Sequence, residues 1–215
     1  MDTRTRIMKE AGILFSRHGI RTVTMDQIAE HLGMSKRTIY ENFKDKNDLL
    51  HQAIYEASIF HRELSLKTIN DADNVIEAIY ELAELMRMTM KKISPDFMMD
   101  LKKFYPDMHN LFTEKSDIRN YSLTYTLLKK GVNEGVFRKD FNIDLVNEAW
   151  QELAAVISNR NFQERMEFSK KEVACSLFFP FLRGLCTEKG VELVEKNREK
   201  LLNIHSKNID DNNNK

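Results

Sequence analysis

Residues 24–46 of the chain read TMDQIAEHLGMSKRTIYENFKDK and predict two short helices joined by a tight turn. Thr24 and Gln27 have capping-box spacing, which lets the hydroxyl and the side-chain amide satisfy free backbone groups at a helix start. Gly33 stands where a left-handed residue would end this helix, and Ser35 can cap the next one. The stretch therefore predicts a helix, a turn and a second helix.

Apolar residues recur at helical spacing within both predicted helices. Ile28 and Leu32 share one side of the first, and Ile39 and Phe43 share one side of the second. The other side chains of the second helix are Lys36, Arg37, Thr38, Tyr40, Glu41 and Asn42. A short helix with such donors suits a major groove, where Arg and Asn discriminate bases. Spacing alone leaves open the alternative that the pair is an ordinary helical hairpin that binds no DNA.

Composition favours an almost entirely helical protein. The 215 residues include only 3 Pro and 7 Gly, with 31% charged residues, and this length allows one or two domains. A formal net charge of zero argues against a generally basic nucleic-acid coat. Residues 1–46 nevertheless carry nine Lys or Arg against six Asp or Glu, an excess of three positive charges. That excess is sufficient for a small local DNA footprint.

Targeting and metal-binding patterns are not found in the sequence. No run approaches the roughly 20 apolar residues of a membrane span, and the N-terminus has no apolar signal region, so we expect a cytoplasmic protein. Cys175 and Cys186 lie eleven residues apart in one predicted helix, roughly 16 Å along its axis, too far to bridge. We expect buried free thiols, with a redox sensor as the less favoured alternative. No metal-binding motif occurs, and we expect neither metal nor cofactor.

The fixed positions of this stretch resemble the TetR family of bacterial transcriptional regulators. The pattern TxxxIAxxxGxSxxTxYxxFxxKxxL is carried by Thr24, Ile28, Ala29, Gly33, Ser35, Thr38, Tyr40, Phe43, Lys46 and Leu49. The predicted helix over 3–18, closed by His18-Gly19, is similar to the family's first helix. The specific resemblance covers about the first fifty residues, with weaker features beyond them.

The resemblance implies a set of DNA-binding residues. These are Thr24, Met25, Ser35, Lys36, Arg37, Thr38, Tyr40, Glu41, Asn42 and Lys46. Thr24, Tyr40 and Lys46 match positions that contact the phosphate backbone. Arg37 departs from the small residue or proline frequent at its position, so we expect a direct guanine contact. Glu41 could accept from a cytosine amino group or could only repel other DNA.

The rest of the chain predicts further amphipathic helices, so the fold class is all-α with about nine or ten helices. The expected later segments are 45–66, 75–93, 95–104, 107–134, 142–160, 169–188 and 191–205. The predicted domains are a three-helix helix-turn-helix DNA-binding domain over 1–47 and a larger helical regulatory and dimerisation domain over 48–205. A disordered tail is expected over 206–215.

The predicted helix over 169–188 points to a homodimer. Phe178-Phe179-Pro180-Phe181 is apolar nearly all round, and Pro180 should kink the helix. One side can meet the core of the same chain, so the other is expected to meet a second copy, and the resemblance implies a four-helix dimer bundle. The expected interface residues are Trp150, Leu153, Ile157, Leu177, Phe178, Phe181 and Leu185.

Residues 71–190 also contain many large, soft side chains that could line an apolar ligand pocket. The candidates are Met86, Met90, Phe97, Phe104, Tyr121, Tyr125 and Trp150. For any one of them, ordinary core packing is the favoured interpretation. The ligand itself cannot be read from the sequence.

The leading hypothesis is a homodimeric, sequence-specific repressor that leaves a palindromic operator when a small, largely apolar ligand binds. One alternative is a ligand-independent regulator whose C-terminal part only dimerises. The other is a helical-bundle enzyme, which is disfavoured because the sequence shows no nucleophile–base pair, paired acids or metal cluster at useful spacing. Target genes, effector, and repression as opposed to activation stay open.

Overall fold

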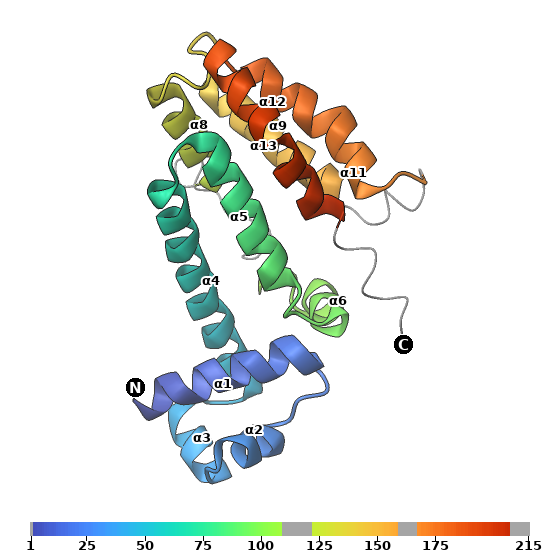
Figure 1. The fold of residues 1–215 in the computed structure, drawn as a ribbon. Coiled ribbons are helices and arrows are strands. Elements are labelled where there is room, and N and C mark those ends of the chain that lie inside the picture. The colour runs from blue at the N-terminus through green and yellow to red at the C-terminus, as the bar shows by residue number, and fades with distance from the viewer. Residues whose placement is uncertain (1, 109–121, 159–166, 207–215) are drawn as a thin grey trace. The chain divides into compact units, whose positions relative to one another are not determined.

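The computed structural model describes residues 2–108, 122–158 and 167–206, and confirms the all-α prediction for them (Figure 1). The earlier helices are α1 (Thr3–His18), α2 (Met25–Leu32), α3 (Lys36–Asn42), α4 (Lys46–Asp71), α5 (Val75–Met90) and α6 (Pro95–Phe104). The later ones are α8 (Leu123–Asn133), α9 (Ile143–Ser158), α11 (Lys170–Val173), the π-helical segment η2 (Ala174–Phe178), α12 (Phe179–Leu185) and α13 (Glu188–Ser206).

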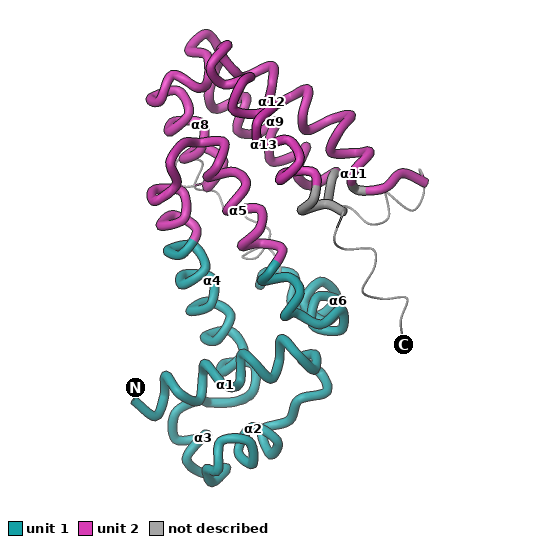
Figure 2. The backbone as a smooth tube through the Cα atoms, viewed as in Figure 1, with its two compact units in different colours: residues 1–64, 88–117 teal, residues 65–87, 118–215 magenta. Residues whose placement is uncertain are grey.

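The chain forms two compact units, coloured separately in Figure 2. Unit 1 comprises residues 1–64 and 88–117, and unit 2 comprises residues 65–87 and 118–215. This division differs from the predicted boundary after residue 47, because α4 and α5 each contribute to both units. The predicted domain limits, including the tail, remain predictions, and residues 207–215 of that tail lie outside the described residues. Among the described helices, none has a sufficiently long apolar stretch to traverse a bilayer.

Unit 1 has one apolar core to which helices α1, α2, α3, α4 and α6 all contribute. Phe15 of α1, Ile28 of α2 and Ile39 of α3 are completely buried in it. Helix α6 also belongs to this core, since Phe97 and Leu101 are buried among the same residues. Burial of large apolar side chains contributes about 1.5–3 kcal/mol each. The core that holds the helices of residues 24–46 therefore includes side chains from both segments of unit 1, residues 1–64 and residues 88–117.

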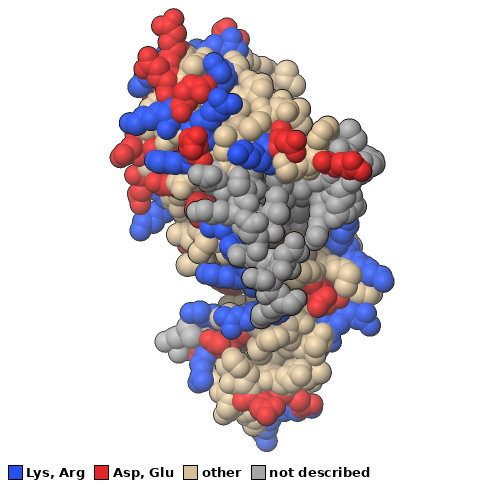
Figure 3. All heavy atoms as spheres, turned by 45° about the vertical axis from the view of Figure 1, so that its right-hand side comes forward, with Lys and Arg blue, Asp and Glu red and all other residues tan. Residues whose placement is uncertain are grey.

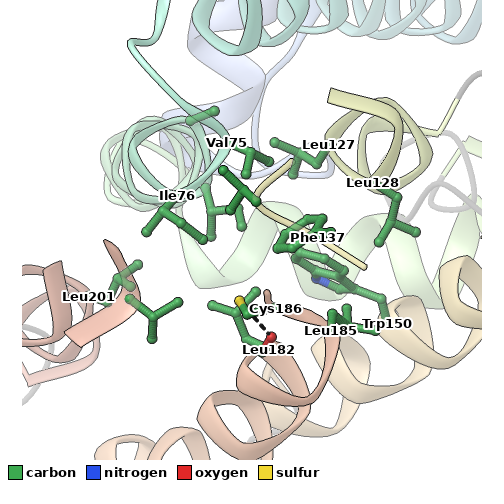
Figure 4. Close-up of a cluster of buried hydrophobic side chains, with 14 of the residues drawn as sticks. Val75, Ile76, Leu127, Leu128, Phe137, Trp150, Leu182, Leu185, Cys186 and Leu201 are labelled. Atoms are coloured by element: carbon green, nitrogen blue, oxygen red, sulfur yellow. Dashed lines mark hydrogen bonds between the residues drawn. The ribbon is translucent and has the colours of Figure 1, made fainter. Parts of the chain in front are cut away.

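Unit 2 has its own core, in which side chains from α5, α8, α9 and α12 meet (Figure 4). Phe137 lies near its centre, with Trp150 beside it. The Trp150 ring meets the edges of Phe178 and Phe181 at centroid distances of 5.8 and 5.9 Å. Edge-to-face pairs of this kind stabilise beyond the area that they bury. The aromatic run of residues 178–181 thus serves the core of its own subunit.

The predicted helix over 169–188 is interrupted and ends earlier than expected. Pro180 lacks a backbone N–H, and the turn before it is π-helical over Ala174–Phe178. The helix stops at Leu185 because Cys186 is extended and pairs with Phe137. The amide of Arg138 donates to the Leu185 carbonyl (2.8 Å), which closes this junction.

Helix α4 is longer than expected. The spacing predicts its end near residue 66, followed by a turn over 68–71, but the helix continues to Asp71. Ile69, in the expected turn, is completely buried in the core of unit 2. Burial of that side chain outweighs the turn-forming tendency of the neighbouring Asn70 and Asp71.

Candidate nucleic-acid interface

Helix α2 begins and ends as its sequence predicts. The Thr24 hydroxyl accepts from the Gln27 amide (3.2 Å), and Gln27 Oε1 accepts from the Thr24 amide (2.8 Å), which confirms the capping box. Gly33 adopts φ +63°, and its N–H caps the carbonyls of Ala29 and Glu30. Only glycine adopts this left-handed conformation without strain. The turn into α3 is therefore specified locally.

Helix α3 has one buried side and one solvent-exposed side. Ser35 accepts from the Thr38 amide (3.1 Å) at its start, as predicted. Ile39 and the capping residue Phe43 are 0% and 1% exposed. The exposed side chains of α3 are Lys36, Arg37, Tyr40 and Glu41. The helix thus offers cations, a phenol and a carboxylate to a partner while two apolar anchors hold it.

The two cations of this exposed side are paired with carboxylates. Lys36 Nζ lies 2.5 Å from Asp26 Oδ1 on α2, and Arg37 Nε donates to Glu41 Oε1 at 2.9 Å. The hydrogen bond to Asp26 raises the pKa of Lys36. Exposed pairs of this kind contribute little to stability, so phosphates or base edges can replace the carboxylates.

The remaining predicted DNA-binding residues differ in exposure. Thr24 and Ser35 are exposed helix caps, Thr38 and Asn42 are half-buried, and Met25 is 7% exposed within the core of unit 1. The burial of Met25 gives it a packing role, because α2 places its side chain inward, and it is not one of the exposed residues on which we base DNA recognition. The side-chain amide of Asn42 donates to the Thr38 carbonyl (2.8 Å).

Lys46 is the first residue of α4 and lies half-buried, its ammonium 5.9 Å from the centre of the Phe15 ring. Burial lowers its pKa, while the negative charge of Asp100 acts in the opposite direction. Asp45 caps the same helix start by accepting from the Asp48 amide (2.9 Å). A lysine at a helix N-terminus is suitably placed for a phosphate.

Sequence reasoning missed the contacts that α1 makes with the ends of α2 and α3. Arg4 donates to the carbonyl of Asn42 and to Oε1 of Gln52, and Arg6 donates to the carbonyl of Leu32 (3.3 Å). No local pattern could reveal these contacts, because they join residues 26 to 48 positions apart.

Helix α6 makes a further set of contacts that sequence reasoning missed. The buried carboxylate of Asp100 accepts from the Arg21 amide (2.9 Å), and the Arg21 guanidinium lies 5.0 Å from the centre of the Phe104 ring. The loop between α1 and α2 is therefore fastened to α6 by a buried acceptor.

The predicted ligand-lining residues are divided between the two units. Phe97 is in the core of unit 1 and Trp150 in that of unit 2, whereas Met86, Met90 and Phe104 are 43–45% exposed. Tyr125 is partly buried in unit 2, and Tyr121 lies outside the described residues. Their burial agrees with the packing role for Phe97 and Trp150.

The structure has an open cavity of about 480 Å³ within unit 1, and it is lined by none of these predicted residues. Arg4 and Met8 of α1 and His51, Gln52 and Tyr55 of α4 line it. It therefore does not correspond to the predicted apolar ligand pocket.

The predicted interface residues divide in the same way. Trp150 and Leu185 are buried in their own subunit's core. Leu153, Phe178 and Phe181 are partly exposed, Leu177 is 39% exposed, and the side chain of Ile157 lies outside the described set. Trp150 and Leu185 are therefore not available to a second copy. The partly or fully exposed side chains are available, and these are Leu153, Leu177, Phe178 and Phe181.

Within the described residues, no group of three or more His, Cys, Asp or Glu side chains is placed to hold a metal ion. Both cysteines are free, and Cys186 donates its thiol proton to the Leu182 carbonyl (3.2 Å; Figure 4). Burial raises the pKa of this thiol to about 11. Cys186 is therefore a structural thiol.

On the face drawn in Figure 3, Lys and Arg side chains are interspersed with Asp and Glu side chains.

Comparison with known proteins gives a family for the N-terminal region. Residues 7–53 match the model of the tetR family of bacterial regulatory proteins. An HTH-type transcriptional regulator of Staphylococcus aureus (strain USA300) is 40% identical over 53 residues, which are 25% of this chain and 29% of that protein. The match therefore spans less than a third of the length of this relative.

Solved structures share the fold over most of the chain. A transcriptional regulator from Saccharomonospora viridis in complex with choline has a TM-score of 0.62 at 20% identity, covering 86% of this chain and 98% of that one. A TetR-family transcriptional regulator from Mesorhizobium loti has a TM-score of 0.62 at 19% identity, covering 87% and 100%. At this identity the similarity concerns the fold alone.

Proposed function

The chain belongs, through residues 7–53, to the TetR family of bacterial regulatory proteins, and on that premise we propose a homodimeric transcriptional repressor. It binds a palindromic operator in the cytoplasm and leaves the operator when a small, largely apolar ligand binds. Its activity is binding and not catalysis.

The observation that carries this proposal is the exposed side of α3. Lys36, Arg37 and Tyr40 project from a helix whose opposite side is anchored by Ile39 and Phe43. Arginine can donate two hydrogen bonds to guanine, and lysine and tyrosine can reach phosphates. In this proposal Thr24, Ser35, Thr38, Glu41, Asn42 and Lys46 complete the contact surface.

A second copy is the partner that the exposed apolar residues support. Leu177 is exposed, and Leu153, Phe178 and Phe181 are partly exposed on α9, η2 and α12. A twofold dimer would present two copies of α3, and binding two half-sites one turn of duplex apart needs them about 34–36 Å apart. The twofold symmetry of such a dimer is the reason for proposing a palindromic operator.

Ligand responsiveness is supported by the Saccharomonospora viridis neighbour, whose structure contains choline. A ligand can weaken DNA binding only if it binds the DNA-competent and DNA-incompetent states with different affinity. The alternative, a ligand-independent regulator, is favoured by the dispersal of the predicted lining residues between two units. A thermal-shift screen of lipophilic compounds, with operator release measured for each hit, separates the two. A compound that releases the operator supports the ligand-responsive repressor. Compounds that shift the melting temperature without releasing the operator support the ligand-independent regulator.

The direct test of the proposed function is selection of bound duplexes from a random DNA pool. We expect a twofold-symmetric sequence with half-sites one helical turn apart. Arg37→Ala should weaken binding to the selected duplex by about tenfold or more, since a good base contact contributes about 1–3 kcal/mol of discrimination. Tyr40→Phe should have a smaller effect. Lys139→Ala, which removes an exposed cation from unit 2, is the matched control.

A monomeric protein in solution, or a pool that yields no enriched sequence at low salt, would overturn the proposal. Equal losses of affinity in Arg37→Ala and Lys139→Ala would also contradict it. In that case binding would depend on net charge and not on the α3 surface.

A further inference from the structure

The two helices of the helix-turn-helix end in different ways. Helix α2 is closed by Gly33 in the left-handed conformation. Helix α3 ends at Phe43 in extended conformation and has no basic residue in its last turn. The last carbonyls of a helix carry partial negative charge and lack partners within the helix. The last carbonyl of α3, that of Asn42, is therefore free to accept from a donor elsewhere in the chain.

Arg4, near the start of α1, provides that donor. One of its terminal nitrogens donates to the Asn42 carbonyl, and the other donates to Oε1 of Gln52 on α4. Its guanidinium carbon lies 4.6 Å from the centre of the Phe43 ring, which is only 1% exposed. A planar, two-pronged cation can stack and donate in this way, whereas an ammonium cannot hold the same three contacts.

The contacts of Arg4 continue into the turn between α3 and α4. The Gln52 amide donates to Oδ1 of Asp48 (2.6 Å), and Oδ2 of Asp48 accepts from the backbone amide of Lys44 (2.9 Å). The hydrogen bond from the Lys44 amide has the larger effect in lowering the pKa of Asp48, and the one from Gln52 acts in the same direction. The chain from Asn42 to Asp48 is thus connected to α1 through side chains on both sides of the turn.

Arg6 makes a similar contact with the C-terminal end of α2. It lies two residues after Arg4, and its guanidinium donates to the Leu32 carbonyl in the last turn of α2 (3.3 Å). The first turns of α1 therefore donate to the C-terminal ends of both helices of the helix-turn-helix. At 3.3 Å, a longer hydrogen bond, this second contact is the weaker of the two.

We propose that Arg4 is a positioning residue for DNA recognition, which holds the C-terminal end of α3 against α1 and α4, and that Arg6 supports α2 in the same way. This inference rests on the proposed function and adds a residue that does not touch DNA. The other possibility, a phosphate contact by Arg4, is less favoured because both terminal nitrogens already donate within unit 1, to Asn42 and to Gln52.

The salt dependence of DNA binding distinguishes positioning from phosphate contact. Removing one phosphate contact makes the slope of log K against log salt shallower by about 0.9. The probes are the duplex obtained by selection and a scrambled duplex of equal length. For Arg4→Ala we expect roughly tenfold weaker binding to the selected duplex, unchanged binding to the scrambled one and an unchanged slope.

Arg4→Lys keeps the charge and serves as the conservative variant. If Arg4 positions α3, lysine should not restore specific binding, because the ammonium cannot bridge two acceptors and stack on Phe43 together. Lys9→Ala removes an exposed charge from the same helix and is the matched control, with no change expected. Arg6→Ala should lie between this control and Arg4→Ala.

A measurement without DNA keeps the two proposals separable. In the full-length protein, Arg4→Ala should increase hydrogen exchange at the amides of residues 42–46, with the melting temperature of the whole protein little changed. This result supports positioning even if no operator is found, in which case only the proposed function fails. Restored binding in Arg4→Lys, a shallower salt slope in Arg4→Ala, or unchanged exchange at residues 42–46 would each overturn the inference.

Discussion

Residues 24–46 and residues 169–190 both form helices joined by short connections, but their ends have different physical causes. In the first region a capping box, a left-handed glycine and a serine cap mark the helix limits. In the second, α12 ends where Cys186 pairs with Phe137, about fifty residues away in sequence. Limits encoded by adjacent residues can be predicted from sequence, whereas limits set by distant contacts cannot.

The largest expected effect is the loss of stability when a buried side chain of the first region, residues 24–46, is truncated. Phe43→Ala should lower the free energy of unfolding by about 3–5 kcal/mol, because the phenyl group is 1% exposed and its removal leaves a cavity. Chemical denaturation of the full-length protein measures the change. Phe60→Ala, at a position 66% exposed in the same unit, should cost far less. Equal destabilisation in the two variants would contradict the assigned packing.

A methyl group at Gly190 probes the distant contact of the second region. A Cβ there would lie 2.2 Å from the Val136 carbonyl oxygen and 2.8 Å from the Cys186 side chain. We therefore expect Gly190→Ala to destabilise unit 2 by about 1–3 kcal/mol, although alanine favours helix. Gly184→Ala is the matched control, since a Cβ there meets nothing within 4 Å. It should stabilise the protein slightly, and a similar stabilisation in Gly190→Ala would refute the steric argument.

The same substitution at Gly33 probes the first region. Nothing lies within 4 Å of a Cβ at this position, so only the backbone conformation, φ +63°, opposes alanine. We expect Gly33→Ala to cost about 1–2 kcal/mol, and Gly33→Asn less, because asparagine tolerates the left-handed region. If asparagine and alanine proved equal by thermal denaturation, a cause other than φ would be needed.

The smallest expected effect is a pH dependence within unit 1. His61 is half-buried, its Nε2 lies 2.8 Å from the Thr89 hydroxyl, and burial lowers its pKa. A lowered pKa means that the unfolded state binds the proton more readily than the folded state. The contribution of His61 is therefore fully present above the ordinary histidine pKa and is lost as pH falls from about 7 towards 5.

His61→Gln should flatten this part of the curve of melting temperature against pH. His18→Gln, at an exposed position, serves as the control. An unchanged slope in His61→Gln would assign the pH dependence to other groups.

Much of the fold was predictable, and the reason lies in particular residues. The predicted helix over 95–104 was confirmed. In the structure its start is capped by Ser94, and Ser169 forms a capping box with Glu172, so both caps come from residues adjacent in sequence. The extension of α4 through Ile69 was not predicted, because burial of that side chain in the core of unit 2 decides it. That interaction is outside the window in which helical periodicity operates. The disturbance of the helix at Pro180 was predicted as a kink, whereas its form, a π-helical turn over Ala174–Phe178, was not.

The candidate DNA interface was predictable to a similar degree. The exposed positions of Lys36, Arg37 and Tyr40 follow from the helical spacing of Ile39 and Phe43. The burial of Met25 in the core of unit 1 and the contacts of Arg4 do not, because both depend on segments that are distant in sequence. Roles at the DNA surface stay predictions until binding is measured.

The place of α6 in the core of unit 1 has a consequence for protein synthesis. Phe97 and Leu101 are buried with the apolar residues of α1, α2 and α3, and Asp100 holds the loop at Arg21. A ribosome makes roughly 5–20 residues per second, so α1–α3 wait several seconds before α6 emerges. During that interval the nascent helix-turn-helix exposes the apolar surface that α6 later covers, and a fragment cut after residue 47 would expose it permanently.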